Sequence, residues 1–258
     1  LLKNGWLVQS KIFLNYQNLG NPTTAVKRLS EWAADELIYL DISSNDIYDI
    51  RRDDQAYPNR KTFLEIISDV SKYAFMPITV GGKIEKLENI NQFLKNGADK
   101  VTINKTARIN PNFVKMASKE FGSQCIVVSV DVKMIEGDYF VYCHEKKNTN
   151  ELKALEWIKK MEDYGAGEIL LNSVNRDGMM NGYDIDLIKM ASDIINIPII
   201  ACGGAGEWSD FYEALSRTNV AAVAAANIFH FKDQSVYLAK KFLYDNGINV
   251  REPSLIHL

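Results

Sequence analysis

The sequence predicts an α/β fold, a (β/α)8 barrel built from two similar (βα)4 halves in a single domain, residues 1–258. Two stretches resemble each other, Pro77-Ile-Thr-Val-Gly-Gly82 and Pro198-Ile-Ile-Ala-Cys-Gly-Gly204, and each is a Pro-led apolar strand that ends in two glycines. Short apolar runs alternate with amphipathic stretches from end to end, which is typical of repeated βα units around a parallel sheet. Such a barrel needs about 250 residues, which agrees with the length of this chain.

Each predicted strand is a short apolar run, and most of these runs stop at a Gly, Asp or Asn. In chain order they are Leu37–Asp41, Pro77–Val80, Lys100–Ile103, Ile126–Asp131, Glu168–Leu171, Pro198–Ala201 and Ala221–Ala225. Leu1–Lys3 has the pattern of a strand end, so we expect it to finish the first strand, which is otherwise largely missing from this chain.

Amphipathic stretches between these runs predict eight helices. Asn21 before Pro22, and Asn110 before Pro111, each supply a capping amide and a proline suited to a first helical turn. The predicted helices are Thr23–Ala34, Lys61–Tyr73, Lys86–Asn96, Pro111–Phe121, Glu151–Tyr164, Ile185–Ile195, Glu207–Arg217 and Ser235–Asn246. The stretch Ser43–Arg60 is predicted to be a long loop, and long loops in compact domains are usually functional lids or disordered.

Composition excludes several classes of function. A net charge of −3 with scattered basic residues argues against a nucleic-acid footprint. Three cysteines without CxxC spacing, and three histidines without HxH or HExxH spacing, predict neither a disulfide framework nor a metal site. No apolar run approaches the roughly 18 residues that span a bilayer, and no signal-peptide pattern opens the chain. We expect a cytoplasmic protein without a cofactor and without a membrane partner.

The candidate chemistry lies at the carboxyl ends of the strands, where a parallel barrel builds its active site. The polar or small residues there are Asp41, Gly81, Gly82, Asn104, Asp131, Asn172, Gly203, Gly204 and Asn227. Asp131 follows a purely apolar strand, and partial burial at a barrel mouth suits a carboxyl for acid–base work. The alternative for Asp131 is a loop cap. For Asp41, an Asx turn that holds the next loop is about as good an interpretation as a catalytic one.

Small residues in three consecutive βα loops predict a phosphate site. Asp177-Gly178 is a turn that offers backbone N–H groups, and it precedes Gly203-Gly204 and Ala226-Asn227 along the chain. Taken alone, Asp-Gly is a common turn, but late barrel strands often form a phosphate pocket from such loops. Gly81-Gly82 and Asn104 predict a second pocket in the first half. His230 is interpreted as a packed residue, and a Schiff base on Lys100 or Lys133 has little support.

Several segments then show that the chain resembles the HisF family, the synthase subunits of imidazole glycerol phosphate synthase. They are Asp35-Glu-Leu37, Leu40-Asp-Ile42, Thr79-Val-Gly-Gly82, Gly97-Ala-Asp-Lys-Val101, Gly122-Ser-Gln124, Lys147-Asn-Thr149, Gly165-Ala-Gly-Glu-Ile-Leu-Leu171, Arg176-Asp-Gly178, Gly182-Tyr-Asp184, Gly203-Gly-Ala-Gly206 and Phe229-His-Phe231. They occur in the family's order along nearly the whole chain. The resemblance implies a TIM barrel that receives ammonia from a HisH-like glutaminase docked on its amino-terminal face. It also implies a bisphosphate substrate and a pair of catalytic aspartates.

Carried over by position, the resemblance implies that Asp131 is the second catalytic aspartate. It assigns the phosphate contacts to Gly81, Gly82, Asn104, Asp177, Gly178, Gly204, Ala226 and Asn227. It assigns the ammonia gate and the partner face to Glu36, Asp99, Lys100 and Glu168.

The chain departs from the family pattern at the mouth. Leu1 stands where the first catalytic aspartate is expected, Gln9 replaces the lysine of the first loop, and Lys83 and Lys105 replace a Gly and a Thr of the first-half pocket. The loop Ser43–Arg60 is also longer than usual. These departures resemble the HisF-like paralogues of surface-glycan synthesis, which imply ammonia delivery for an acetamidino sugar.

Two other interpretations stay open. One is a histidine-pathway cyclase in which a loop residue replaces the missing aspartate. The other is a noncatalytic ammonia conduit that docks a glutaminase and serves a separate ATP-dependent amidating enzyme.

Overall fold

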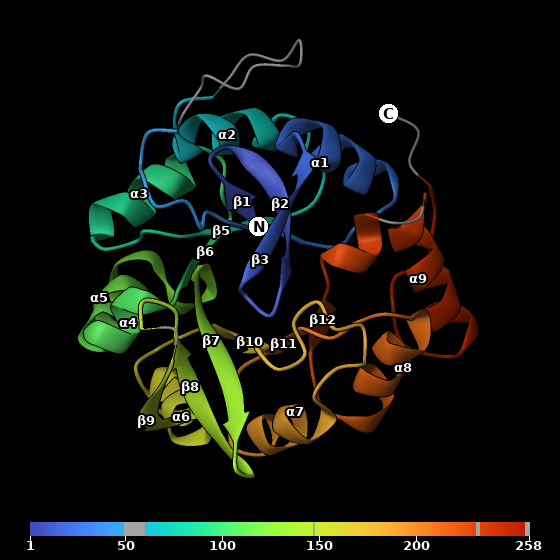
Figure 1. The fold of residues 1–258 in the computed structure, drawn as a ribbon. Coiled ribbons are helices and arrows are strands. Elements are labelled where there is room, and N and C mark those ends of the chain that lie inside the picture. The colour runs from blue at the N-terminus through green and yellow to red at the C-terminus, as the bar shows by residue number, and fades with distance from the viewer. Residues whose placement is uncertain (49–59, 147, 231–232, 256–258) are drawn as a thin grey trace.

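The computed structural model describes residues 1–48, 60–146, 148–230 and 233–255, which fold around a curved parallel sheet (Figure 1). Seven parallel strands of the described chain lie in the order β12-β11-β10-β7-β6-β5-β4. The strands are β4 (Leu37–Leu40), β5 (Ile78–Gly81), β6 (Lys100–Ile103), β7 (Ile126–Ile135), β10 (Glu168–Ser173), β11 (Ile199–Cys202) and β12 (Ala222–Ala224). Leu2, in β1 (Leu2–Lys3), adds a parallel bridge to Asp41, so the first strand lies at the free edge of β4.

Helices surround this sheet, as Figure 1 shows in a view down the barrel. They are α1 (Pro22–Glu31), α2 (Phe63–Ser71), α3 (Leu87–Lys95), α4 (Lys105–Ile109), α5 (Asn112–Phe121), α6 (Ala154–Asp163), α7 (Ile185–Ser192), α8 (Trp208–Arg217) and α9 (Ser235–Asp245). Each predicted helix has a counterpart within a few residues of its predicted ends. Only the short α4, between β6 and α5, has no counterpart in the sequence prediction. No helix in these ranges is long and apolar enough to cross a bilayer.

The strands are parallel and buried because their residues are apolar on both faces. Every residue of β5 is buried, and in β7 the run Ile126–Val132 is buried throughout. Such runs suit a sheet that is covered by helices outside and filled by side chains inside. The pairing of β10 with β7 sets Asn172 directly beside Asp131. The strand register therefore places two polar side chains together at one end of a strongly apolar core.

One of the two predicted helix caps is confirmed. Asn21 Oδ1 accepts a hydrogen bond of 2.8 Å from the backbone N–H of Thr23, and α1 begins at Pro22. The prediction for Asn110 is wrong, because α5 begins at Asn112 without a side-chain cap. Asn110 instead ends the short helix α4, and its backbone N–H bonds the carbonyl of Thr106. The residue at the N-cap position of α5 is Pro111, which has no side chain that can accept a hydrogen bond.

Two hairpins were missing from the sequence prediction. The first joins β1, β2 (Trp6–Lys11) and β3 (Asn15–Gly20) as a separate three-stranded sheet, and the second extends β7 through β8 (Asp138–Cys143) and β9 (Asn148–Lys153). The start of the predicted helix Glu151–Tyr164 is thereby wrong, since Glu151–Lys153 belongs to β9. The turns Asn4-Gly5 and Glu136-Gly137, all at positive φ, are two-residue hairpin signals that the sequence prediction overlooked.

Candidate active site

Asp131 lies at the centre of the mouth, the end of the barrel where the parallel strands finish. Its carboxylate is buried and accepts three hydrogen bonds. Asn104 Nδ2 donates to Oδ2 at 2.6 Å, and Asn172 Nδ2 donates to Oδ1 at 3.2 Å. These amides come from the ends of β6 and β10, the strands on either side of β7. The three residues predicted from separate strand ends therefore form one cluster.

His144 is the third donor, and the sequence analysis did not select it. The residue follows β8, which lies between β7 and β9, and its Nε2 is 2.8 Å from Asp131 Oδ2. Because a carboxylate only accepts hydrogen bonds, Nε2 carries the proton. The ring packs at centroid distances of 4.7 Å from Phe13 and 5.2 Å from Tyr142. Only the fold of the unpredicted hairpin brings His144 to the acid.

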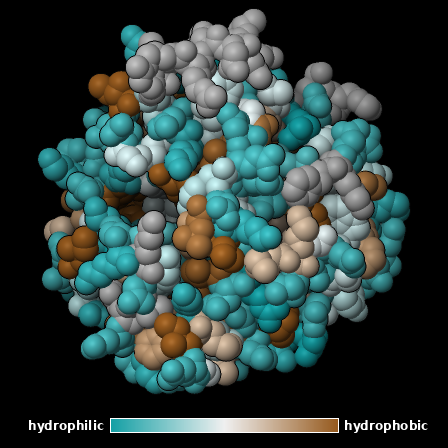
Figure 2. All heavy atoms as spheres, in the orientation of Figure 1, coloured by the Kyte–Doolittle hydropathy of each residue, from teal (hydrophilic) through white to brown (hydrophobic). Residues whose placement is uncertain are grey.

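The second-half pocket is joined to the first hairpin. Asp177 Oδ2 accepts from Ser10 Oγ at 2.8 Å and from the backbone N–H of Phe13 at 3.3 Å. Asn227 Nδ2 donates to the Ser10 carbonyl at 2.8 Å. The hairpin thus lies across the mouth, and in Figure 2 apolar side chains gather at its tip in the middle of this face. Burial raises the pKa of Asp177, and the hydrogen bonds from Ser10 and Phe13 oppose that rise.

The glycines of this pocket are required by close backbone contacts. A Cβ on Gly178 would lie 2.4 Å from the Ser10 carbonyl oxygen, and one on Gly204 would lie 2.1 Å from the Gly182 carbonyl oxygen. A Cβ on Gly203 would lie 2.8 Å from Asn172 Oδ1. That buried oxygen has no hydrogen-bond partner among the residues the structure places. Ala226 lies one residue before the 3-10 turn η2 (Asn227–His230) and bonds through its carbonyl to Phe229.

The first-half pocket contains charges that are already paired. Lys83 Nζ lies 3.4 Å from the buried Asp41 carboxylate and 3.3 Å from Asp46. Lys105, more exposed, lies 3.7 Å from Glu85. Asp41 Oδ1 also accepts from the backbone N–H of Ser43 at 2.9 Å, which is the Asx-turn contact. Most of the loop Ser43–Arg60 lies outside the described residues.

The glycine pair of this half is also enforced by packing. A Cβ on Gly81 would lie 2.4 Å from Thr102 Cγ2, and one on Gly82 would lie 2.2 Å from the Asp41 carbonyl oxygen. In both halves a strand ends in two glycines because a neighbouring segment leaves no room for a Cβ, whereas the charged residues of the two halves differ.

The floor, at the amino ends of the strands, contains a separate charged cluster. Lys100 Nζ lies 2.6 Å from Glu168 Oε1 and 3.2 Å from Glu36 Oε2. These residues come from β6, β10 and the residue before β4, which are not neighbours in the sheet, so the ion pairs cross the inside of the barrel. Burial opposes the charge of Lys100, but the bonds and charges of Glu168 and Glu36 outweigh it and raise the lysine pKa. Asp99 Oδ2 instead accepts from the backbone N–H of Ile78 at 2.8 Å.

Comparison with known proteins adds independent information on this arrangement. The family described as "Histidine biosynthesis protein" matches residues 1–235. A protein of Hydrogenobaculum sp. named imidazole glycerol phosphate synthase subunit HisF is 39% identical over 251 residues, covering 97% of this chain and 95% of the relative. Its namesake in Sulfolobus acidocaldarius is 40% identical over 250 residues, with the same coverage of both chains. The chain belongs to the HisF family. Both the predicted family and the predicted TIM-barrel class are confirmed.

Set against the HisF-family expectation, the structure groups the predicted residues into three places. Asn104, Asp131 and Asn172 lie together at the centre, while the second-half loops meet the first hairpin. Glu36, Lys100 and Glu168 lie together at the floor. No group of three or more His, Cys, Asp or Glu side chains in the described ranges is arranged to hold a metal ion.

Replacement of His144 by glutamine is expected to cost more stability near pH 6 than near pH 9. Burial alone would lower the pKa of His144, but the bond and charge of Asp131 outweigh it and raise that pKa. The pair therefore contributes fully below the ordinary imidazole pKa of about 6.5, and its contribution is lost as pH rises through the raised pKa. Urea denaturation at both pH values measures the difference.

His230 provides a control of opposite sign. Burial and the nearby Arg28 guanidinium lower the pKa of His230 to about 4. The unfolded chain then binds this proton more tightly, so His230 lowers stability as pH falls below about 6.5. His230→Gln should therefore lose less stability at low pH than at high pH.

If His144→Gln lost the same free energy of unfolding at both pH values, the pairing of His144 with Asp131 would be contradicted.

Proposed function

We propose that this chain is the ammonia-using subunit of a glutamine amidotransferase complex, with a HisH-type glutaminase as its partner. The observation that carries the proposal is the crossed ion-pair cluster of Lys100, Glu36 and Glu168 on the floor of the barrel, opposite the mouth that holds Asp131. The named relatives are subunits of imidazole glycerol phosphate synthase. In this proposal ammonia enters past the cluster and reacts at the mouth.

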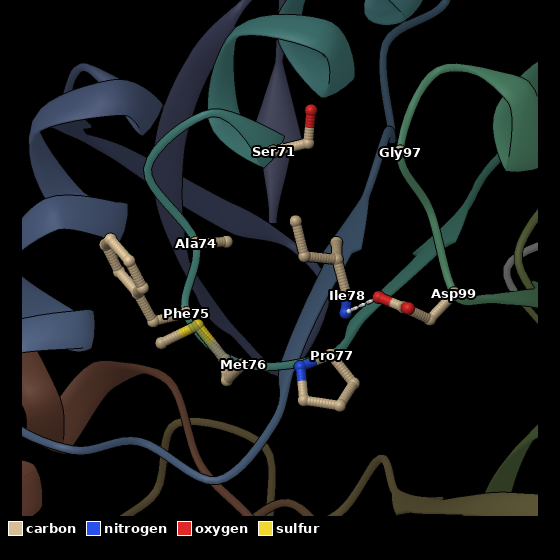
Figure 3. A pocket seen from close by; sticks show the side chains of 8 residues that line it. All are labelled: Ser71, Ala74, Phe75, Met76, Pro77, Ile78, Gly97 and Asp99. Carbon is tan, nitrogen blue, oxygen red and sulfur yellow. Dashed lines mark hydrogen bonds between the residues drawn. The ribbon is translucent and has the colours of Figure 1, made fainter.

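A pocket of mixed polar and apolar lining, at the same end of the barrel as the cluster, supports partner docking on the floor. The pocket has a volume of about 420 Å³ and is lined by residues that precede β5 and β6. Figure 3 shows Phe75, Met76 and Pro77 along one side, and Asp99 bonded to Ile78 on the other. Phe75 is 67% exposed. Aromatic side chains such as that of Phe75 are enriched at the buried centre of protein interfaces.

We further propose that the acceptor is a phosphorylated or sugar-linked molecule, as in acetamidino-sugar synthesis for surface glycans. The support lies in the mouth. Lys83 and Lys105 add charge to the first-half pocket and are paired with Asp41, Asp46 and Glu85, whereas the second half retains small residues around Asp177. The first-half pocket departs from the HisF-family pattern and the second-half pocket keeps it, which supports an acceptor that differs from the family's substrate in one of its two ends. A third, ATP-dependent enzyme would complete such an amidation.

Mixing the chain with its glutaminase and glutamine tests this proposal directly. Glutamate release should rise above that of the glutaminase alone, and the two proteins should elute together in gel filtration. Absence of both binding and stimulation would contradict the proposal.

Lys100→Met should remove glutamine-driven turnover while ammonium-driven turnover continues, because only the floor is altered. Lys153→Met, on a half-exposed lysine that precedes α6 and is away from this pocket, is the matched control.

Replacement of Phe75 by aspartate is expected to weaken the glutaminase complex by about tenfold or more, since an interface anchor would become a charge. Isothermal titration measures the dissociation constant. Ile109→Asp is the matched control, because Ile109 has the same exposed fraction of 67% but lies on α4 at the opposite end of the barrel. Equal effects of the two substitutions would count against docking at this pocket.

A second candidate is a cyclase of histidine biosynthesis. It is favoured by the position of His144 against Asp131, since a residue of the second hairpin stands where a second acid–base group is required. An ammonium-driven assay with the bisphosphorylated formimino ribonucleotide distinguishes the candidates. Turnover that Asp131→Asn abolishes supports the histidine-pathway reaction, whereas turnover only on a sugar acceptor supports the first proposal.

A further inference from the structure

We propose that the imidazole of His144 is a catalytic proton-transfer group of the mouth and works as a pair with Asp131. The inference rests on the second candidate function, the cyclase reaction, because it concerns the addition of ammonia at this site. It assigns the second acid–base role, for which Leu1 offers no titratable side chain, to a residue of the hairpin formed by β7, β8 and β9.

The hydrogen bonds around Asp131 divide the work between the two side chains. The carboxylate accepts from Asn104, Asn172 and His144, and it is almost fully buried. His144 is the accessible member, with 44% of its side chain exposed. Its Nε2 is engaged with Asp131, and no described residue makes a hydrogen bond to Nδ1. The geometry therefore leaves Nδ1 available to a bound molecule, while Asp131 fixes the ring and its charge.

The surroundings of His144 keep its ring in place and determine its charge. Phe13, at the tip of the first hairpin, and Tyr142, on β8, pack against the ring. The charged groups that face it are Asp131 on β7, the adjacent Glu145, and Arg108 on α4. Arg108 Nη2 lies 2.6 Å from Glu145 Oε2, so these two charges largely satisfy each other. The Asp131 carboxylate remains as the main partner of the imidazolium.

A proton on Nδ1 suits the addition of ammonia to a carbonyl carbon. The nitrogen lone pair forms the C–N bond, the C=O pair moves to the oxygen, and that oxygen takes the proton from Nδ1. The ammonium group then returns one proton to Nδ1, which restores the imidazolium. The net change joins one carbonyl compound and one ammonia into one carbinolamine, and it needs no oxidant, reductant or other co-reactant. General acid–base groups of this kind typically contribute about 10²–10⁴ in rate.

The pairing is tested by NMR titration of the histidine rings in the full chain. The chain has only three histidines, and His230→Gln and His144→Gln variants assign their signals. We expect the His144 signal to titrate above the ordinary imidazole pKa, and its midpoint to fall in Asp131→Asn. An unchanged midpoint in that variant would overturn the pairing and with it the proposal.

The catalytic role is tested by the kinetics of His144→Gln with ammonium chloride and the bisphosphorylated formimino ribonucleotide as the probe. We expect kcat to fall by about 10²–10⁴, with KM within roughly threefold of the wild type. The wild-type rate should decline as pH rises through the His144 midpoint, and the variant should lack this decline. If His144 had only a structural role, the variant and the wild type would show the same dependence of rate on pH. Asp138→Asn, an exposed position on the same hairpin, is the control.

The outcomes separate this proposal from the proposed function. Glutaminase stimulation requires only the floor, so it is measured in the same preparations. Two results would overturn the role of His144 alone, provided that glutaminase stimulation is normal. One is a kcat of His144→Gln within roughly threefold of the wild type, and the other is no turnover of the probe by the wild type. Absence of stimulation by the wild-type chain overturns the proposed function.

Discussion

Replacement of Asp131 by asparagine is expected to lower ammonium-driven turnover by about 10²–10⁴, the usual contribution of a general acid or base. The substitution removes the charge but retains the size of the side chain. Asn104, Asn172 and His144 all donate to the present carboxylate. An amide nitrogen at this position must face at least one of these donors, and the imidazole loses its charged partner.

For the cyclase reaction, the second candidate function, steady-state kinetics on the formimino ribonucleotide with ammonium chloride measures this effect. The fall should appear in kcat, because the lost interaction acts on the reacting groups. Glutaminase stimulation by the variant should equal that of the wild type, since Asp131 lies at the far end of the barrel from Lys100. Asp138→Asn makes the same chemical change at an exposed site and should alter the rate by less than about twofold. Equal rates in Asp131→Asn and the wild type would exclude the carboxylate from the reaction.

Replacement of Gly204 by alanine is expected to lower the free energy of unfolding by about 3 kcal/mol or more. Gly204 has a φ of +107°, which L-residues rarely adopt, and a Cβ there would lie 2.1 Å from the Gly182 carbonyl oxygen. The same two residues are joined by a hydrogen bond of 3.0 Å from Gly182 N–H to the Gly204 carbonyl. Because the obstacle is backbone, it is relieved only by separating the two loops of the second-half pocket.

Gly20 separates the steric clash from the cost of the backbone conformation. Its φ of +119° is close to that of Gly204, yet a Cβ there would meet nothing within 4 Å. Gly20→Ala should therefore cost only about 1 kcal/mol, the conformational part. Urea denaturation of the two variants measures the difference. Similar losses would show that the contact between Gly182 and Gly204 relaxes freely.

The barrel strands could be predicted from the sequence because each is a short apolar run, and apolar residues are the ones that a core buries. The glycine pairs Gly81-Gly82 and Gly203-Gly204 were predicted for the same reason, since a missing Cβ is visible in any sequence. Their partners across space, such as the Asp41 and Gly182 carbonyls, were not. They depend on how two distant loops approach.

The hairpins were harder to predict, and with them the arrangement around Asp131. At the end of the first hairpin, Ile12 and Phe13 adopt positive φ without any glycine, so residue type gives no turn signal there. His144 has no motif around it, and its meeting with Asp131 follows from the antiparallel pairing of β8 with β7. Local signals specify strands and turns, whereas this contact is a product of tertiary pairing.

The first hairpin has a consequence for how the second-half pocket fills. The Ser10 carbonyl occupies the amide of Asn227, and the Ser10 hydroxyl occupies the carboxylate of Asp177. Ser10 and a bound anion therefore compete for the Asn227 amide. An anion that binds this amide must first displace Ser10, which costs about 1 kcal/mol for each hydrogen bond broken. Since Phe13 of the same hairpin packs on His144, displacing the hairpin also removes packing from the acid–base pair. Anion occupancy of the second-half pocket and the order of the acid–base pair are thereby thermodynamically linked.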